Sequence, residues 1–265
     1  MFKVVRKHTF NENLFLLEIE AEPIARNAGP GQHVDIRLNP DAVVLTLPIV
    51  DVDADKGTIT IVNRALDLPD EQLMMLGEND EIFQVRGPLG TTVSIDSTAK
   101  IVLVAQGLGV ASLLWRARSY HDRGSHTICV LGFETADDVF WESEFADACD
   151  ELYVTTEDGT YGISGRVTGP VRAVCETHGD VERIVMIGDL KSMKRAAKFA
   201  EDHGIQARMS FDAIRTPAGA ANIFDVANSS QEAFNFARAC EIDARQIDFD
   251  KLIKKQRSIE GTVQP

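Results

Sequence analysis

The chain has 265 residues, of which 44% are hydrophobic and 26% are charged, a composition typical of a globular protein with a sizeable core. Its formal net charge is 27 − 41 = −14, which argues against nucleic acid as a partner because phosphate binding needs a basic surface. No apolar run approaches the roughly 20 residues that span a bilayer, and none follows the basic N-terminus, so we expect a cytoplasmic protein without a membrane segment.

Residues 1–98 carry the pattern of a small antiparallel β-structure. Short apolar runs, typical of strands, are separated by turn sequences rich in glycine, proline and aspartate. The runs are NLFLLEIEA (13–21), QHVDIRL (32–38), GTITIVNRAL (57–66) and EIFQVRG (81–87). One short helix fits at 70–77. Because many short strands with little helix are typical of barrels and sandwiches, we expect an antiparallel β-barrel over 1–98.

From residue 99 onward, strand patterns alternate with helix patterns. Strand-like runs lie at 100–106, 126–133, 151–157, 183–188 and 205–211. Helix-like runs lie at 110–124, 137–149, 167–179 and 190–204. This alternation indicates βαβ units, so we expect a Rossmann-like domain with a parallel sheet over 99–211. Residues 212–265 form a third, C-terminal region for which we expect no core of its own.

Two strand–glycine–helix junctions predict a nucleotide site. Gly107, Leu108 and Gly109 follow the first parallel strand, and Gly188 and Asp189 follow a later one. A glycine turn lets a pyrophosphate approach the backbone, while the helix N-terminus offers N–H donors and a positive dipole. Both junctions lie at carboxyl ends of strands, where open parallel sheets bind ligands. We therefore predict a nicotinamide nucleotide there; glycines that serve only a tight bend are the alternative.

Glu134 ends another strand, in the sequence VLGFET at 130–135. Its carboxylate could accept hydrogen bonds from a ribose diol, which would favour NAD over NADP because a carboxylate repels a 2′-phosphate. An acid that is simply solvated in a loop is the alternative.

Neither histidine nor cysteine spacing predicts a metal site. None of the six histidines pairs at i, i+4 in the pattern of a zincin site, so we expect solvated or core-edge histidines. No two of the four cysteines form a C-x-x-C motif, so we expect buried thiols. The cysteines are Cys129, Cys149, Cys175 and Cys240.

Several longer segments together resemble a known family. They are DKGTITIV (55–62), GPLG (87–90), LVAQGLGVASLL (103–114), CDELYVTTEDGTYGISGRVT (149–168) and IDARQIDFDKLIKKQ (242–256). Nearly the whole chain resembles the ferredoxin–NADP reductase-like family. Within it, the chain resembles the electron-transfer subunits of dihydroorotate dehydrogenase and, still more, the small subunit of NADH-dependent ferredoxin:NADP oxidoreductase, also called sulfide dehydrogenase. The resemblance implies a subunit that holds FAD, NAD(P)H and a [2Fe–2S] cluster and passes electrons to a larger redox subunit.

The first flavin motif that the resemblance implies is altered. The family places an Arg and then a Ser or Thr on one barrel strand, where the Arg holds the FAD pyrophosphate. In VVLTLPIVDVD, Val44 stands at the Arg position and Pro48 at the hydroxyl position, with Thr46 nearby as a candidate contact. Arg37 or Arg64 from a neighbouring strand is a candidate substitute cation.

The second flavin element, a Gly-Lys-Thr-Thr-like turn in the family, reads DLPD at 67–70. Two carboxylates there would repel a pyrophosphate. A third motif persists, either as a flavin contact or as a tight turn that leaves the barrel. It consists of Gly87, Pro88, Leu89 and Gly90. The resemblance thus implies FAD, the altered motifs argue against it, and both alternatives stay open.

The nicotinamide part of the resemblance is better preserved. Gly107 and Gly109 match the family, whereas Asp189 stands where the family has a Pro after its second glycine motif. Asp158 and Gly159 stand at the acidic-glycine turn of the family and are candidate contacts.

The cluster-binding part of the resemblance has lost its cysteines. Ala221, Phe224 and Phe236 stand at cysteine positions of the family, and Thr216 lies near the upstream ligand position. Cluster iron needs soft thiolate ligands, so we predict that the [2Fe–2S] cluster is absent.

Two functions follow from these observations. In the first, the chain is an electron-transfer subunit that passes electrons between NAD(P)H and a partner subunit through FAD, without a cluster of its own. In the second, it is a non-catalytic structural or regulatory subunit of a larger redox complex that has lost flavin binding.

Overall fold

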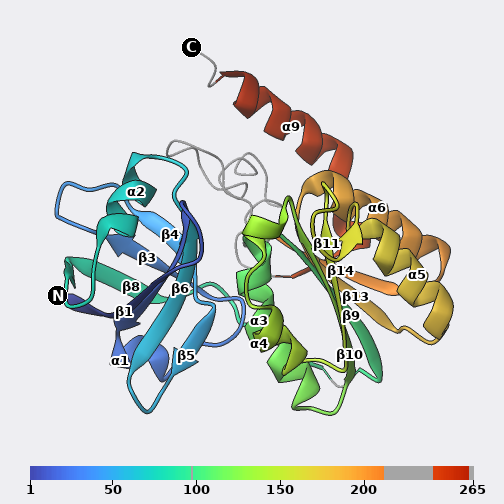
Figure 1. Cartoon of the computed structure of the whole chain (residues 1–265), viewed down its shortest axis with the longest axis horizontal. Coiled ribbons are helices and arrows are strands. Elements are labelled where there is room, and N and C mark those ends of the chain that lie inside the picture. The colour runs from blue at the N-terminus through green and yellow to red at the C-terminus, as the bar shows by residue number, and fades with distance from the viewer. Residues whose placement is uncertain (97, 212–240, 263–265) are drawn as a thin grey trace.

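The computed structural model describes residues 1–96, 98–211 and 241–262. The chain forms two halves that lie side by side: a β half of residues 1–96, and an α/β half of residues 98–211 and 241–262 (Figure 1). Among the described residues, no helix combines the length and the apolar character that crossing a membrane requires.

The β half consists of two antiparallel sheets, of order β5-β6-β2-β1-β7 and β4-β3-β8. The strands are β1 (Phe2–Thr9), β2 (Leu14–Glu20), β3 (His33–Arg37), β4 (Leu45–Pro48), β5 (Asp51–Asp53), β6 (Thr58–Arg64), β7 (Glu81–Ile82) and β8 (Gln84–Leu89). Two short helices lie between them, α1 (Glu22–Ala25) and α2 (Leu68–Met75). Both sheets contribute to one apolar core, which is the barrel-like arrangement that the sequence predicts.

Strand β2 is buried on both faces because it lies between two cores. Side chains alternate along a strand, so neighbours point to opposite faces. Phe15 and Leu17 pack within the β half, whereas Leu14 and Leu16 pack into a core that they share with the α/β half. The unbroken apolar run of β2 therefore joins the two halves.

The α/β half is built on one seven-stranded sheet, of order β12-β11-β10-β9-β13-β14-β15. Its strands are β9 (Lys100–Gln106), β10 (His126–Phe133), β11 (Glu151–Thr156), β12 (Ile163–Ser164), β13 (Arg183–Ile187), β14 (Gln206–Ser210) and β15 (Ile242–Asp243). All neighbours pair in parallel except β14 and β15. This parallel sheet after antiparallel sheets confirms the predicted fold class.

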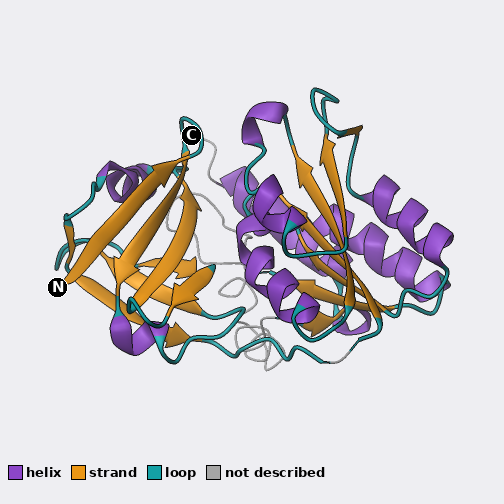
Figure 2. Ribbon diagram, turned by 60° about the horizontal axis from the view of Figure 1, so that its bottom comes forward, coloured by secondary structure: helices purple, strands orange, loops and turns teal. Residues whose placement is uncertain are grey.

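Helices cover both faces of this sheet (Figure 2). They are α3 (Gly109–His121), α4 (Glu142–Ala146), α5 (Thr168–His178), α6 (Leu190–Asp202) and α9 (Phe249–Thr262). Side chains of α3 and α4 pack into the core shared with β2, and those of α5 and α6 pack into a second core on the other face. The chain leaves β9 in one direction along the sheet and later returns beside it as β13, so a topological switch point lies between these two strands.

The helix predicted over 137–149 is wrong in its extent. A single 3-10 turn at Ala136–Asp138 precedes α4, and Trp141 between them has a left-handed backbone with φ of 59°. The ring of Phe10 packs against Phe140 and Trp141, with centroid distances of 5.1 and 6.0 Å. This contact between the halves outweighs the local helical pattern.

The C-terminal region was expected to lack a core of its own, and its described part uses the core of the α/β half. Ile242, Ala244, Ile247 and Phe249 are buried in the second core. Strand β15 adds to the sheet edge beside β14, so the described end of the chain is continuous with the α/β half.

Candidate functional site

A pocket of about 570 Å³ lies at the carboxyl ends of the parallel strands. The ends of β9, β10, β11 and β13 all contribute to its wall, so it spans the switch point between β9 and β13. This is the place where open α/β sheets bind ligands, because successive strands leave a crevice there.

Glycines bring bare backbone to the pocket wall. Gly107 has φ of +53°, and an added Cβ there would meet no atom within 4 Å, so a side chain would extend into free space. An added Cβ at Gly188 would lie 2.4 Å from Oε1 of Gln106, and one at Gly132 would lie 2.3 Å from Cγ1 of Val167. Gly188 therefore permits close packing of the ends of β13 and β9, and Gly132 permits close packing of the end of β10 against the start of α5.

Two polar atoms at the pocket lack a protein partner. Within the described part of the chain, Oε1 of Gln106 and Oγ1 of Thr155 are buried and make no hydrogen bond. Buried polar atoms are normally paired, so these atoms fit a site where a ligand supplies the missing hydrogen bonds.

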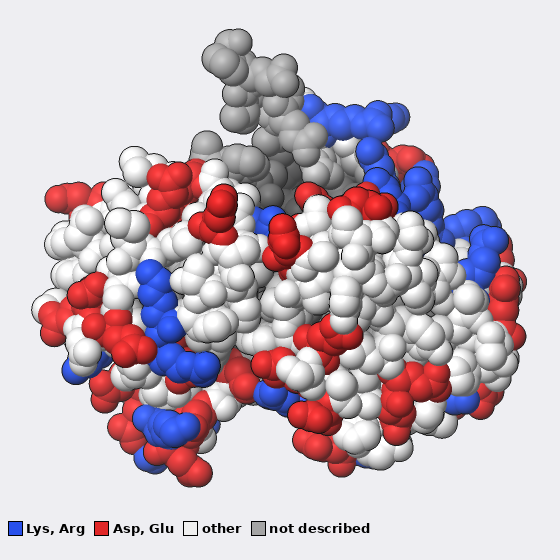
Figure 3. Space-filling view, in the orientation of Figure 1, with Lys and Arg blue, Asp and Glu red and all other residues white. Residues whose placement is uncertain are grey.

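The pocket combines acids and cations. The acids that line it are Glu134, Glu157 and Asp189, and the cations are Arg166, Lys191 and Arg257. Nε of Arg166 lies 3.4 Å from Oε1 of Glu157. In Figure 3, Lys and Arg gather over α6 and α9, whereas acids are spread over both halves. The charges in the pocket wall are balanced, and Lys191 and Arg257 are the cations that could meet an anionic ligand in this chain of net charge −14.

Asp189 forms the N-cap of α6. Its Oδ1 accepts hydrogen bonds from the backbone N–H of Lys191 at 2.9 Å and of Ser192 at 3.0 Å. The side chain is exposed, and its partial loss of hydration opposes ionisation, but hydrogen bonds with Ser192 and Lys191 and the charge of Arg166 outweigh this and lower its pKa. Asp189 therefore occupies the N–H groups that a phosphate would use at α6, while α3 begins without a side-chain cap at Leu108.

The sequence-predicted nucleotide residues divide into two groups. Gly107, Glu134, Gly188 and Asp189 lie together in the pocket wall. Leu108, Gly109, Asp158 and Gly159 are not among its lining residues. They remain predictions as nucleotide contacts.

Each residue of the second group has a structural explanation. An added Cβ at Gly109 would lie 2.9 Å from Cγ2 of Ile187, so this glycine lets α3 pack against β13. Leu108 packs against the core shared by the two halves. Asp158 and Gly159 form the turn after β11, where Oδ1 of Asp158 accepts from the backbone N–H of Thr160 at 3.0 Å.

Helix α9 contributes pocket residues that local sequence patterns do not reveal. Ile253, Gln256 and Arg257 line the pocket although they follow Gly188 by more than sixty positions. Nζ of Lys194 in α6 contacts Oδ1 of Asp250 in α9 at 2.7 Å, and the two helices pack together. Thr155 and Glu157 also line the pocket but were not predicted from the sequence. They stand at the carboxyl end of a parallel strand, as Gly107 does, so the same criterion could have found them.

The sequence-predicted flavin residues lie together on the three-stranded sheet, away from this pocket. Thr46 is in β4, and Gly87, Pro88 and Leu89 are in β8, with Gly90 directly after it. The hydroxyl of Thr46 donates to Oδ1 of Asp35 at 2.7 Å. Asp35 also forms an ion pair with Arg86. The Thr46 hydroxyl and the Arg86 guanidinium therefore both have a partner within the protein.

The start of α2, which stands at the family's second flavin element, presents acids where the family binds the FAD pyrophosphate. Asp67 caps the N-terminus of α2 by accepting from the backbone N–H of Asp70, and Asp70 and Glu71 lie in the first turn. Three acids at this helix start disfavour an anionic ligand. Arg64, a candidate substitute cation, pairs with Asp138 at 3.0 Å and thereby links the two halves.

The replaced cluster positions lie outside the described residues. These are Thr216, Ala221, Phe224 and Phe236, together with Cys240. Among the described residues, Cys129, Cys149 and Cys175 are buried free thiols, as the sequence predicts.

Comparison with known proteins identifies the family. The chain is 28% identical over 255 residues to a Thermotoga maritima homologue of the electron transfer subunit of dihydroorotate dehydrogenase B, covering 96% of this chain and 89% of that protein. It is 31% identical over 176 residues to this electron transfer subunit from Bacillus caldolyticus, covering 64% of this chain and 68% of that protein. The chain belongs to the ferredoxin–NADP reductase-like family.

The fold of this family member agrees with solved structures. A chain of the NADH-dependent reduced ferredoxin-NADP oxidoreductase superposes with a TM-score of 0.82 at 25% identity, covering 99% of this chain and 96% of that chain. A ferredoxin reductase from a carbazole 1,9a-dioxygenase superposes with a TM-score of 0.64 at 18% identity, which supports the fold alone. No family model matches the sequence.

Proposed function

We propose that this chain is the nicotinamide-nucleotide-binding subunit of a larger electron-transferring oxidoreductase. The observation that carries the proposal is the pocket at the switch point between β9 and β13, with the bare backbone of Gly107 and Gly188 in its wall. The names of two relatives support the existence of a partner subunit, because both describe an electron transfer subunit of a dehydrogenase.

The pocket residues have distinct roles in this proposal. The open space at Gly107 admits the pyrophosphate to the backbone, and Lys191 and Arg257 neutralise its charge. Oε1 of Gln106 and Oγ1 of Thr155 form hydrogen bonds with the ligand. Glu134 accepts hydrogen bonds from a ribose, which favours NAD(H) over NADP(H).

Two versions of this function differ in the flavin. In the first, the β half would hold FAD, which would supply the chemistry of accepting hydride from the nucleotide and of passing electrons to the partner. In the second, the chain binds the nucleotide without flavin and has a structural or regulatory role. The acids at the start of α2 and the pairing of Arg64 with Asp138 favour the second version.

Calorimetric titration with NADH and NADPH tests the pocket. We expect binding of NADH by the full chain, and at least tenfold weaker binding by Gly107→Ala, whose methyl group enters the pocket. Gly124→Ala is the matched control, since Gly124 also has a positive φ with no atom within 4 Å of its added Cβ and lies outside the pocket. Equal binding by both variants, or no binding by the wild type, would contradict the proposal.

Visible absorption after incubation with FAD and gel filtration separates the two versions. A colourless protein that still binds NADH and co-purifies with a larger reductase supports the version without flavin. Stoichiometric FAD after gel filtration supports the electron-transfer version and excludes the other.

A further inference from the structure

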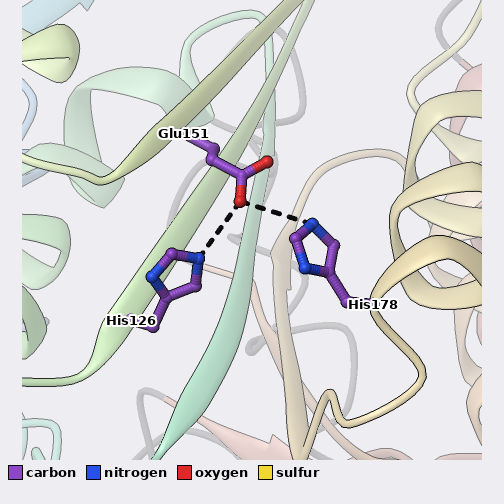
Figure 4. A group of neighbouring side chains, drawn as sticks. All are labelled: His126, Glu151 and His178. Atoms are coloured by element: carbon purple, nitrogen blue, oxygen red, sulfur yellow. Dashed lines mark hydrogen bonds and ion pairs between the residues drawn. The ribbon is translucent and has the colours of Figure 1, made fainter.

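Three side chains with metal-binding atoms meet at the end of the sheet opposite the nucleotide pocket. His126 begins β10, Glu151 begins β11, and His178 ends α5 (Figure 4). The parallel register places the starts of β10 and β11 side by side, and α5 returns to the same edge. No local spacing reveals this group, because its members are 25 and 27 positions apart (151 − 126 and 178 − 151).

The ligand atoms have a spacing that suits a transition-metal ion. Oε1 of Glu151 lies 3.1 Å from Nε2 of His126 and 3.3 Å from Nε2 of His178. The three ligand atoms lie within 4.8 Å of one another. Zinc bonds of 2.0–2.2 Å in a tetrahedron put neighbouring ligands about 3.3 Å apart, so a small inward movement of one imidazole completes the geometry.

The surrounding groups orient two of the three side chains as in metal sites. The hydroxyl of Tyr153 donates to Oε2 of Glu151 at 2.9 Å, which turns Oε1 toward the imidazoles. Nδ1 of His126 lies 3.7 Å from Oδ2 of Asp150, beyond hydrogen-bond distance, so this carboxylate favours the orientation electrostatically while Nε2 faces the centre. Carboxylate and hydroxyl partners of this kind typically fix metal ligands.

Lys100 limits the site at His178. Its Nζ lies 3.3 Å from Nδ1 of His178 and 2.8 Å from Oδ1 of Asp180. A metal on Nε2 leaves the proton on Nδ1, so the contact between Lys100 and His178 must open. Asp180 lies on the surface and can retain the ammonium group when this happens.

We propose that His126, Glu151 and His178 bind one divalent ion of the zinc class. The choice of ion follows from two imidazoles and one carboxylate, a ligand set that zinc accepts in proteins. The His126, Glu151 and His178 side chains are 38%, 29% and 20% exposed, so water can reach the remaining coordination position. The ion would connect β10, β11 and α5 at the end of the sheet remote from the nucleotide. The sequence predicts solvated or core-edge histidines, so the proposed metal test decides between that expectation and this site.

Calorimetry of the full chain, prepared without a histidine tag and freed of metal with EDTA, tests the site. Titration with zinc chloride is expected to give one equivalent. His126→Gln and His178→Gln are each expected to weaken binding at least thirtyfold, and Glu151→Gln at least tenfold. The matched control is His8→Gln, because His8 is an exposed histidine in the β half. It is expected to bind as the wild type does.

Two further measurements make the outcome decisive. The visible spectrum with cobalt(II) is expected to show tetrahedral bands without thiolate charge transfer, which excludes binding by cysteines. Lys100→Met is expected to tighten zinc binding several-fold, because it removes a cation and frees Nδ1 of His178. Absence of stoichiometric zinc in the wild type, or unchanged binding in folded His126→Gln and His178→Gln, would overturn the proposal, as would a thiolate band.

Discussion

Asp189 holds the first turn of α6 and lines the nucleotide pocket with the same carboxylate. The two roles can be separated by a matched pair of variants. Asp189→Asn keeps an oxygen that caps the helix and removes the negative charge. Asp189→Ala removes both the cap and the charge.

The expected magnitudes follow from the contacts. Asp189→Ala loses the hydrogen bonds to the backbone N–H of Lys191 and Ser192, so the 13-residue helix should lose about 1 kcal/mol of stability. Asp189→Asn should change stability by a few tenths of a kcal/mol. Because Asp189 is exposed, water screens its repulsion of a phosphate 4 Å away to about 1 kcal/mol. Removing this repulsion should lower the Kd for NADH roughly fivefold.

Urea denaturation and calorimetric titration with NADH measure the two effects independently. The expected pattern is a lower urea midpoint for Asp189→Ala, an unchanged midpoint for Asp189→Asn, and tighter NADH binding by Asp189→Asn. If Asp189→Asn bound NADH more weakly than the wild type, the carboxylate would be a positive contributor to binding. That result would refute the argument from repulsion at this helix start.

Other predictions test the fold and the titrating groups. Gly109→Ala should destabilise the protein by about 1–3 kcal/mol because the added Cβ meets Ile187. Gly169→Ala in α5 is the control, because no atom lies within 4 Å of its added Cβ. The same urea midpoint for the two variants would contradict this packing role of Gly109. Phe145→Ala should lower stability by about 3–5 kcal/mol because the ring is fully buried, and a loss below 1 kcal/mol in thermal unfolding would argue against this core. Burial raises the pKa of Cys175 to about 11, so this thiol should react with a disulfide reagent at pH 8 only after unfolding, as mass spectrometry of the labelled protein would report. The pKa of Asp189 is lowered in the folded state, so its ionised form stabilises the fold above about pH 4, and this stabilisation is lost as the pH falls through the folded-state pKa. The difference in stability between the wild type and Asp189→Ala should therefore shrink in acid. A constant difference down to pH 2 would contradict this linkage.

The central strands of the α/β half are readable from the sequence because burial on both faces leaves an apolar run. KIVLVAQ becomes β9 and HTICVLGF becomes β10 at the predicted residues. Gly107 and Glu134 directly follow these two strands, so the strand pattern alone predicts that they lie close together, and both line the pocket.

Features that depend on distant contacts could not be predicted. Trp141 adopts a left-handed backbone while its ring packs against Phe10 from the β half, so no local pattern marks the break in the helix. Arg257 reaches the pocket only because α9 packs on α6. The grouping of His126 with His178 depends likewise on how strand starts and a helix end meet.

The position of α9 in the pocket wall has a thermodynamic consequence. Whatever free energy Gln256 and Arg257 contribute to holding a ligand, the ligand contributes equally to holding α9 against α6, because linkage between two equilibria is reciprocal. Occupancy of the pocket is thereby transmitted to residues 249–262, the last described segment of the chain. A partner that binds this helix could sense whether the nucleotide is present without touching it.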